Sequence, residues 1–355
     1  MSSTPAEVSL TLAPQRRFEA IDVNALVNAA HGDLLGRYGR TLYCSMHSTA
    51  GYLQQSLTAR LHHRDDRLHQ LFDAFRVVFP PGAAYRHDQM HLREELTEEQ
   101  REIEPQNADS HLTFIGAGMR NCVTYRNDPP APVYFIDLDG TYRGQRRQRT
   151  TMLLAYDHER LIERQSVDVP VSRHSIDSVN LADPRTGLIE RVNEMLARAG
   201  IEKGRVDLML GPEERDAGLT VNEYETLLMR HDLPEVLRDP LRFARLKGRH
   251  MLDDPFAIPS KTVNYALFDA VRVLNSLMEA LHVDQSVLER LFARVMALPA
   301  RRLLRSRKIG FLATDPDGHG LPRLIRGAYQ SPILVQWRAT ERRARQVQIA
   351  IVQLL

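Results

Sequence analysis

The chain has 355 residues, of which 43% are hydrophobic and 26% are charged, which is ordinary globular composition and a length that suggests two domains or two repeats. The formal net charge is +2, so no strong overall field indicates nucleic acid or a membrane surface as a partner. The sequence contains no apolar run of about 18 residues, so no membrane span is predicted. The N-terminus has no apolar segment typical of a secretory signal. Cys44 and Cys122 lie in apolar runs, where buried free thiols are expected, and we predict a cytoplasmic protein.

The first 160 residues carry strand and helix patterns separated by Gly- and Pro-containing turns. Apolar residues at helical spacing predict helices over 21–35 and 57–78, the first with Leu26 and Val27 on its buried face. A charged and mobile segment is expected over 89–105, and Asp139-Gly140 is typical of a hairpin turn. Alternating polar and apolar residues, or short apolar runs, predict strands at 7–13, 40–46, 120–126, 132–138 and 150–156.

Three of the 14 histidines lie in distinct motifs. These are Met46-His47-Ser48-Thr49-Ala50-Gly51, Tyr85-Arg86-His87-Asp88 and Asn107-Ala108-Asp109-Ser110-His111-Leu112. Imidazole is a common ligand of zinc, and three protein ligands with one open position form a catalytic zinc site. We therefore expect His47, His87 and His111 to share one site, with Asp88 and Asp109 fixing the ring tautomers. Metal-free binding or acid–base chemistry, and purely structural roles, are the alternatives.

Together with Asp139-Gly140, these motifs resemble, in order and spacing, the YjbQ family, also known as secondary thiamine-phosphate synthase-like proteins. The resemblance covers residues 7–157. It implies an α+β fold built on a mixed sheet with helices on one side, usually trimeric, and hence a homo-oligomer. Two family motifs are altered in this half: the family's Asn-Glu falls on Gln55-Ser56, and its Gly-Thr-Trp-Gln falls on Gly144-Gln145-Arg146-Arg147.

The second half repeats the pattern of the first. The segment 217–223 matches 50–56 and contains Asn222-Glu223, while Glu214 stands where the family has histidine. Gly327-Ala328-Tyr329-Gln330 matches the family's Gly-Thr-Trp-Gln. The expected elements are strands at 166–172, 204–210 (matching 39–45), 333–337 and 346–353, and helices at 188–196, 265–281 and 284–298.

These matches predict an α+β protein of two tandem YjbQ-like repeats, 1–160 and 161–355, the second divergent and carrying a helical insertion at about 224–306. Chance similarity between two α+β domains is the alternative. Because the two halves retain different family motifs, we expect one composite site per chain. The first repeat would supply His47, His87 and His111, and the second Asn222, Glu223 and Gln330.

In this composite site, Glu223 would act as general base or complete the ligand set of a divalent metal ion, zinc above all. Gln330 would orient the substrate. The alternative is a site that lies wholly within one repeat, with Asn222-Glu223 as a relic.

Clustered arginines are the second signal. Arg143, Arg146 and Arg147 are expected to bind an anion beside His47, since guanidinium suits bidentate contact with phosphate or carboxylate. Arg149 belongs to the same cluster, and others lie at 301–308 and 342–345. For each cluster, a solvated or inter-subunit surface is the alternative. Nucleic acid is not expected, because only 6% of the residues are aromatic and few lie near the arginines.

The residues and the resemblance together predict an enzyme, a transferase or hydrolase, acting on a small anionic substrate of the phosphate type. Phosphoryl transfer or hydrolysis follows from the resemblance more than from the residues. The rival function is a non-catalytic ligand-binding or scaffold protein of the same fold, because each half lacks family residues.

Overall fold

The computed structural model describes residues 4–127, 131–240, 242–244, 246–247, 304, 306–315 and 322–355. The chain divides into two compact units, each discontinuous in sequence. Unit 1 comprises Met1–Gln55, Gly118–Tyr224 and Leu304–Leu355, and unit 2 comprises Ser56–Ala117 and Glu225–Leu303. Each unit thus takes segments from both predicted repeats. The helices expected at 265–281 and 284–298 lie outside the described residues.

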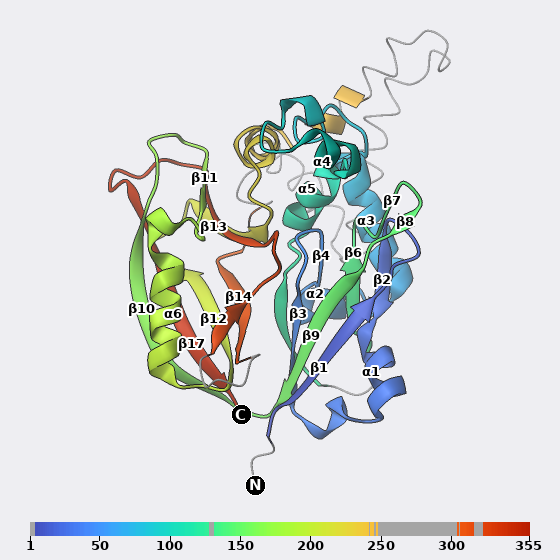
Figure 1. The fold of residues 1–355 in the computed structure, drawn as a ribbon, viewed down its shortest axis with the longest axis vertical. Helices are drawn as coiled ribbons and strands as arrows, with labels where there is room; N and C mark the ends of the chain where they lie inside the picture. The colour runs from blue at the N-terminus through green and yellow to red at the C-terminus, as the bar shows by residue number, and fades with distance from the viewer. Residues whose placement is uncertain are drawn as a thin grey trace, which may run out of the picture. The chain divides into compact units, whose positions relative to one another are not determined.

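The first half of unit 1 contains a four-stranded sheet of order β1-β9-β3-β5, a three-stranded sheet of order β2-β6-β4, and the two-stranded β7-β8 (Figure 1). Helix α1 (Val23–His31) and the 3₁₀ turn η1 (Leu35–Arg37) accompany these sheets. The strands are β1 (Ala6–Leu12), β2 (Glu19–Asp22), β3 (Arg40–Ser45), β4 (Ala50–Gly51), β5 (Cys122–Arg126), β6 (Tyr134–Asp137), β7 (Thr141–Tyr142), β8 (Gln145–Arg146) and β9 (Arg149–Tyr156).

The second half of unit 1 contains a five-stranded sheet of order β10-β17-β12-β14-β15 and a three-stranded sheet of order β11-β16-β13. Helix α6 (Leu188–Ala199) follows the 3₁₀ turn η3 (Pro184–Thr186). The strands are β10 (Glu159–Pro170), β11 (Asp177–Asn180), β12 (Lys203–Leu210), β13 (Ala217–Asn222), β14 (Lys308–Thr314), β15 (Arg323–Ile325), β16 (Ser331–Gln336) and β17 (Ala344–Leu354). Helices and strands occur as predicted for an α+β chain, but every pairing between described strands is antiparallel, so the expected mixed sheet is not found among them.

Local chemistry explains where α1 begins. The Asp22 carboxylate accepts hydrogen bonds from the N–H groups of Asn24 and Ala25, as an N-cap does. The helix therefore begins at Val23, later than the expected 21, because the preceding residues pair as β2. Val23 and Val27 form its buried face, whereas Leu26, expected to be buried, is 40% exposed.

The hairpin after β6 differs from the prediction. The reversal occurs at Arg143-Gly144, where φ is +48° and +77°, and not at Asp139-Gly140. Positive φ at both central residues is the requirement of a type I′ turn, and glycine meets it without steric cost.

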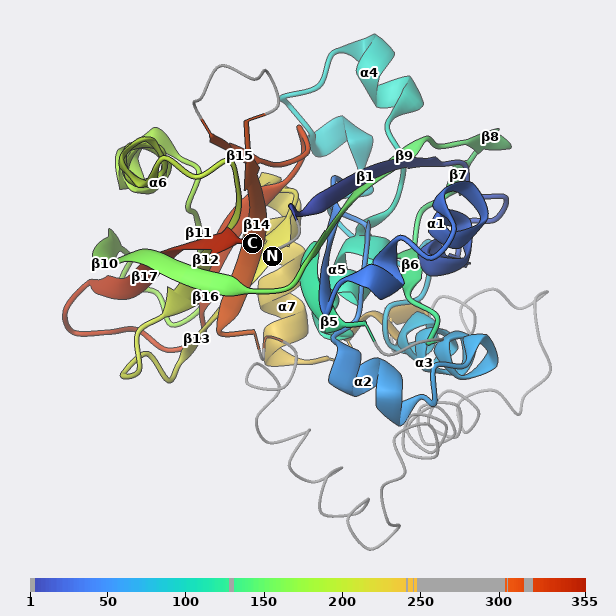
Figure 2. The same ribbon diagram turned by 90° about the horizontal axis from the view of Figure 1, so that it is seen from below.

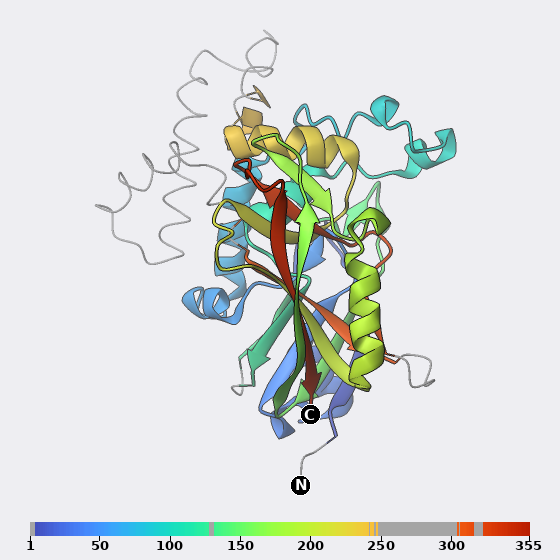
Figure 3. The same cartoon turned by 90° about the vertical axis from the view of Figure 1, so that its left-hand side faces the viewer.

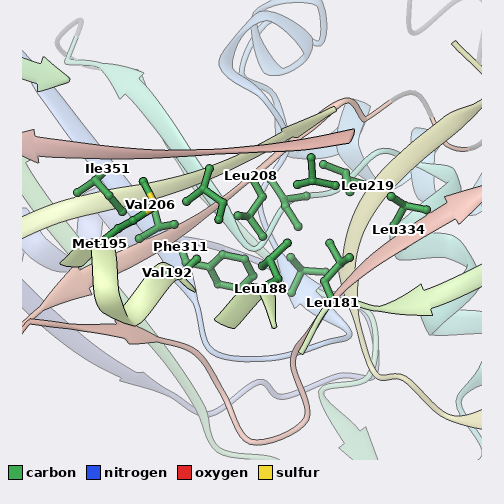
Figure 4. Packing of buried hydrophobic residues seen from close by; sticks show 14 of the residues in the cluster. Leu181, Leu188, Val192, Met195, Val206, Leu208, Leu219, Phe311, Leu334 and Ile351 are labelled. Atoms are coloured by element: carbon green, nitrogen blue, oxygen red, sulfur yellow. The ribbon is translucent and has the colours of Figure 1, made fainter. Parts of the chain in front are cut away.

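The core of the second half is formed by residues of α6, of the five-stranded sheet, and of β13 and β16 in the three-stranded sheet (Figures 3 and 4). Leu188, Val192, Met195 and Leu196 recur at helical spacing and are all fully buried. Burying each of these side chains contributes about 1.5–3 kcal/mol. Gly200 ends α6 in the left-handed conformation, with φ +58°.

The elements of the two halves follow one another in the same order. By their places in the sheets, the strands correspond in these pairs: β1 and β10, β2 and β11, β3 and β12, β4 and β13, β5 and β14, β6 and β16, and β9 and β17. The helices α1 and α6 take the same place in the order of elements. The registers agree as well. Ser45 lies opposite Thr151 and Leu210 opposite Val347, which is the predicted match of 39–45 with 204–210.

This correspondence corrects one alignment. Gly327–Gln330 precedes β16, whose counterpart is β6, because Ala217 lies opposite Gln336 as Ala50 lies opposite Asp137. The segment 144–147 instead precedes β9, whose counterpart is β17. Placing the family's Gly-Thr-Trp-Gln on Gly144–Arg147 was therefore wrong as a counterpart of Gly327–Gln330.

The two large sheets of unit 1 lie side by side (Figures 1 and 2). They contact each other through a shared apolar cluster. Next to it, the Arg205 guanidinium pairs with Asp207 and with Glu159, so charges buried between the sheets are compensated. The buried cluster consists of Leu42, Cys44, Cys122, Leu154, Tyr156, Leu312, Val352 and Leu354.

Unit 2 is helical in its described part, with α2 extending into it from unit 1. The helix expected over 57–78 is broken at His62 and His63, which both adopt positive φ. The segment 89–105, expected to be mobile, contains a short helix that a Thr97/Gln100 capping box begins. The helical elements are α2 (Gln55–Arg60), α3 (Asp65–Val78), η2 (Met90–Leu92), α4 (Glu98–Ile103), α5 (Ala108–Gly116), the π-helical turn η4 (Leu228–Asp232) and α7 (Leu233–Arg238).

Candidate functional site

The turn after β3 holds His47 in a defined frame. The Ser45 hydroxyl donates to the Ala50 carbonyl (2.7 Å) and accepts from the His47 N–H (3.2 Å). The Thr150 N–H donates to Nε2 of His47 (2.7 Å), and the Thr150 carbonyl accepts from the Met46 N–H. Because Nε2 accepts a hydrogen bond, the neutral ring of His47 carries its proton on Nδ1.

Burial lowers the pKa of His47, and the positive charges of Arg149 and Arg147 lower it further, to about 4. The ring is therefore neutral at pH 7 and lies in the positive field of two guanidinium groups. Both guanidinium groups also pair with carboxylates, Arg147 with Asp139 and Arg149 with Asp137, and Arg147 is the more exposed of the two.

The arginines of this cluster lie in different surroundings. Arg147 pairs with Asp139, and the fully buried Arg149 makes two hydrogen bonds to Asp137, at 2.6 and 3.0 Å. Arg143 and Arg146 are exposed on the β7–β8 hairpin. Of the three arginines predicted to bind an anion, Arg147 is thus the one that acts on the His47 ring.

Two of the predicted second-repeat residues contact the His47 turn. The Gln330 Nε2 donates to the carbonyls of Ser45 and His47, both at 2.9 Å, and its Oε1 accepts from the Gly327 N–H (3.0 Å). The Asn222 Nδ2 donates to the Ser48 carbonyl (3.4 Å). Gln330 and Asn222 therefore support the backbone that carries His47.

Gly327 also fits closely against this turn. A Cβ at this position would lie 1.8 Å from the Met46 carbonyl oxygen, so only glycine allows the two backbones to approach as they do. The segment 327–330 and the His47 turn are thus in direct backbone contact.

The second half contains a counterpart of His47. The Glu214 Oε1 accepts from the Gln346 N–H (2.9 Å), as Nε2 of His47 accepts from the Thr150 N–H. Gln346 precedes Val347 just as Thr150 precedes Thr151, so the two donors occupy equivalent positions. At this counterpart, Arg345 binds Glu214 (2.8 Å) in a buried ion pair.

His87 lies at the centre of a buried cluster within unit 2. Its Nδ1 is 2.8 Å from Oε2 of Glu225, and its Nε2 is 3.2 Å from Oδ1 of Asn107. The Asp232 carboxylate accepts from the N–H groups of Arg86 (3.0 Å) and His87 (2.9 Å). The cluster joins residues 86–107 to residues 225–232 and so draws on both predicted repeats.

The charges of this pair are mutually stabilised. Burial alone would lower the pKa of His87, but the hydrogen bond to Glu225 and the negative charges of Asp88 and Glu225 together outweigh it, and the net shift is upward. Burial would raise the pKa of Glu225, but hydrogen bonds from His87, Leu227 and Leu228 outweigh it and the net shift is downward. Both shifts favour a His87⁺–Glu225⁻ ion pair.

The remaining residues of the histidine motifs surround this pair. The rings of His87 and His111 meet edge to face, with centroids 5.4 Å apart. Asp88 accepts from the Ala108 N–H at the start of α5 (3.0 Å). Burial raises the pKa of Asp88 and of Asp232 to about 6.

The predicted six-residue site is thus found as two groups. Unit 1 brings Asn222 and Gln330 to the His47 turn, and unit 2 brings His87 and His111 into one cluster. Glu223 follows Asn222, whose side-chain oxygen accepts from the Glu223 N–H. The composite site and the catalytic role of Glu223 stay predictions.

Glu225 and Asp232 were missed by the sequence reasoning. Glu225 lies two residues after the Asn222-Glu223 motif, and this proximity was the available signal. Asp232 lies in no motif; its role depends on the turn η4, which brings it to the Arg86 and His87 amides.

Two of the three histidines expected to bind a metal ion, His47 and His87, make ring hydrogen bonds to other protein groups. Both ring nitrogens of His87, and Nε2 of His47, have protein partners. In the ranges that the structure describes, no group of three or more His, Cys, Asp and Glu side chains is placed to hold a metal ion. Among the same residues, no helix is both long and apolar enough to cross a membrane.

No family model matches the chain, and no curated protein matches it. A YbjQ-like protein of unknown function from Sulfolobus solfataricus is 16% identical, with 55% of this chain and 99% of that chain covered and a TM-score of 0.30. A hypothetical protein from Aeropyrum pernix is 17% identical, with 54% and 98% covered and a TM-score of 0.28. A YjbQ/UPF0047 family protein from Clostridium acetobutylicum is 11% identical, with 55% and 100% covered and a TM-score of 0.23. The matched structures thus include the family that the histidine motifs resemble, over about 55% of this chain.

Proposed function

We propose that the chain binds a small anion of the phosphate type at the His47 turn and acts on it by acid–base chemistry. The observation that carries the proposal is the placement of the His47 ring: the Thr150 N–H donates to its Nε2, and burial together with the nearby Arg149 and Arg147 lowers its pKa. A neutral imidazole in a positive field can donate Nδ1–H to an anionic oxygen without carrying a charge that must be desolvated.

The site is composite, in that the second half completes the first. Gln330 and Asn222 fix the backbone of the turn and act as positioning residues, and Glu223, next to Asn222, acts as general base. The equal order of elements and the matching hydrogen bonds of His47 and Glu214 support the two halves being copies of one repeat. In the second copy, the Glu214–Arg345 ion pair replaces the histidine, which supports one working site per chain.

The substrate class is tested by phosphate binding, measured by isothermal titration at low and moderate salt. Arg147→Gln should weaken binding about tenfold, equivalent to about 1.4 kcal/mol, and Arg147→Lys should recover part of it. Arg143→Gln is the matched control, because this arginine is exposed on the hairpin and should leave binding unchanged. Equal affinity in all variants, or no binding by the wild type, would refute an anion site at this turn.

Catalysis is tested separately with phosphate monoesters and amides as substrates. Glu223→Gln should abolish turnover while the phosphate affinity and the fold stay unchanged. Zinc remains an expectation for elemental analysis of the purified protein, and no step of the proposal goes through a metal ion.

A second candidate function is that of a non-catalytic binding or scaffold protein. The Gln330 amide favours this function. It forms hydrogen bonds to the backbone of Gly327, Ser45 and His47, so it supports the turn rather than binding a substrate. Phosphate binding by the wild type without turnover of any tested ester or amide would select this function.

A further inference from the structure

Cys44 and Cys122, the two cysteines of the chain, face each other across the β3–β5 pair. Their sulfur atoms are 3.0 Å apart. Both side chains are buried, 2% and 9% exposed, within the apolar cluster between the two large sheets. The two thiols are therefore close enough to form a disulfide when an oxidant accepts their electrons.

The register of the ladder supports bond formation. The Ser45 N–H donates to the Asn121 carbonyl (2.7 Å), and the Asn127 N–H donates to the Gly39 carbonyl (3.1 Å). Hydrogen-bonded and non-hydrogen-bonded pairs alternate in an antiparallel ladder, so Cys44 and Cys122 form a non-hydrogen-bonded pair. Cα atoms of such pairs are about 4.5 Å apart, which lies within the range of disulfides, roughly 4.4–6.8 Å.

We propose that Cys44 and Cys122 are a redox pair, which a low-molecular-weight disulfide oxidises to an intramolecular disulfide that joins β3 to β5. One cysteine thiolate attacks the oxidant's sulfur, forms a mixed disulfide and releases one small thiolate. The second cysteine then attacks the mixed disulfide and releases the other. The two cysteines lose two protons and two electrons, and the oxidant gains two electrons as its S–S bond breaks.

The surroundings set the rate of this reaction. Burial and the hydrogen bond with Cys122 raise the pKa of Cys44, so its thiol is protonated at neutral pH. The thiolate is the attacking form, and oxidation should therefore become faster as the pH rises. β5 is an edge strand of its sheet, which leaves one of its sides without a pairing partner in that sheet.

The bond would act on the proposed site through the strand that carries it. Cys44 lies three residues before His47, and the next pair of the ladder, Ser45 and Asn121, begins the turn. The disulfide would also close a loop that contains residues 56–117, so it removes conformational freedom from the unfolded chain. Oxidation should therefore raise thermal stability.

The test starts from the full-length protein, reduced with dithiothreitol and desalted. It is incubated folded with oxidised glutathione, then denatured with an alkylating reagent and weighed by mass spectrometry. We expect loss of both alkylation sites in the monomer, a mass lower by two hydrogen atoms, and a peptide pair that links Cys44 to Cys122. The melting temperature should rise, and dithiothreitol should reverse both effects.

Cys44→Ser and Cys122→Ser are the matched controls. Each should keep one alkylatable thiol or carry one glutathione, with no rise in melting temperature. The proposal is overturned if the folded wild type keeps both thiols under conditions that oxidise the unfolded chain. It is also overturned if only intermolecular dimers form, or if oxidation lowers the melting temperature. The wild-type measurement suffices by itself should either variant fail to fold.

Discussion

Replacing Gln330 with methionine removes the support that the second half gives to the His47 turn while nearly conserving side-chain volume. The Gln330 side chain is 1% exposed and makes three hydrogen bonds, to Ser45, His47 and Gly327. Methionine cannot donate to the two carbonyls, so buried polar groups lose their partners without a large cavity being formed.

Each of these hydrogen bonds contributes about 1 kcal/mol, so the substitution should lower the free energy of unfolding by about 3 kcal/mol. For a domain of roughly 200 residues, this corresponds to a fall in melting temperature of about 6–12 °C. The position of the His47 ring should also become less defined, because the backbone carbonyl of His47 is one of the two that Gln330 binds.

Urea denaturation followed by circular dichroism measures the loss, together with NMR of the His47 ring. Gln148→Met is the matched control, since Gln148 is exposed and the same change there should cost no more than about 0.5 kcal/mol. A loss below about 1 kcal/mol for Gln330→Met, with an unchanged His47 spectrum, would refute the view that the second half holds this turn.

Two further predictions concern pH. NMR titration should give His47 a pKa of about 4, and because this lies below the ordinary 6.5, its contribution to stability should be present above pH 6.5 and be lost as the pH falls toward 4. His47→Gln should remove that part of the pH dependence, on the order of 2 kcal/mol; parallel stability curves for variant and wild type would contradict it. Glu225→Gln should cost about 3 kcal/mol, because it leaves the buried His87 without its charged partner. The raised pKa of His87 contributes fully to stability below pH 6.5, and the lowered pKa of Glu225 contributes fully above pH 4.5, so the loss of stability should be largest between these pH values. Glu94→Gln, at an exposed glutamate, is the control. An equal loss in both variants would contradict the ion pair.

The strands were predictable because a strand buried on one face alternates polar and apolar residues, and a strand buried on both faces is a short apolar run, as in β3 and β12. Most predicted strands appear within a few residues of their expected bounds, among them 40–46 as β3 and 204–210 as β12. The helix expected over 57–78 failed at His62 and His63, whose left-handed backbone has no sequence signal of the glycine type. The apolar pattern on both sides of that break continues at helical spacing, so periodicity could not reveal it.

The hairpin at Arg143-Gly144 shows the limit of a short motif. Asp139-Gly140 is a strong hairpin signal, but Asp139 pairs with Arg147 and the Gly140 carbonyl accepts from the Arg147 N–H, so both lie at the base of the hairpin. A two-residue motif cannot report which of two glycines lies at the reversal.

For the candidate site, the sequence by itself determined which residue types occur in which motif, and it matched 39–45 with 204–210 and 50–56 with 217–223. The match of Glu214 with His47 came from the resemblance and from aligning 217–223 with 50–56, and equivalent hydrogen bonds support it. Only the tertiary structure decided what those side chains touch. That Gln330 and Asn222 reach the His47 backbone, and that Glu225 and Asp232 hold His87, depends on pairings between residues more than 130 positions apart. A local sequence pattern indicates whether a residue is buried. A buried polar group also needs a hydrogen-bonding partner, and which residue becomes that partner depends on how distant segments pack in the folded chain.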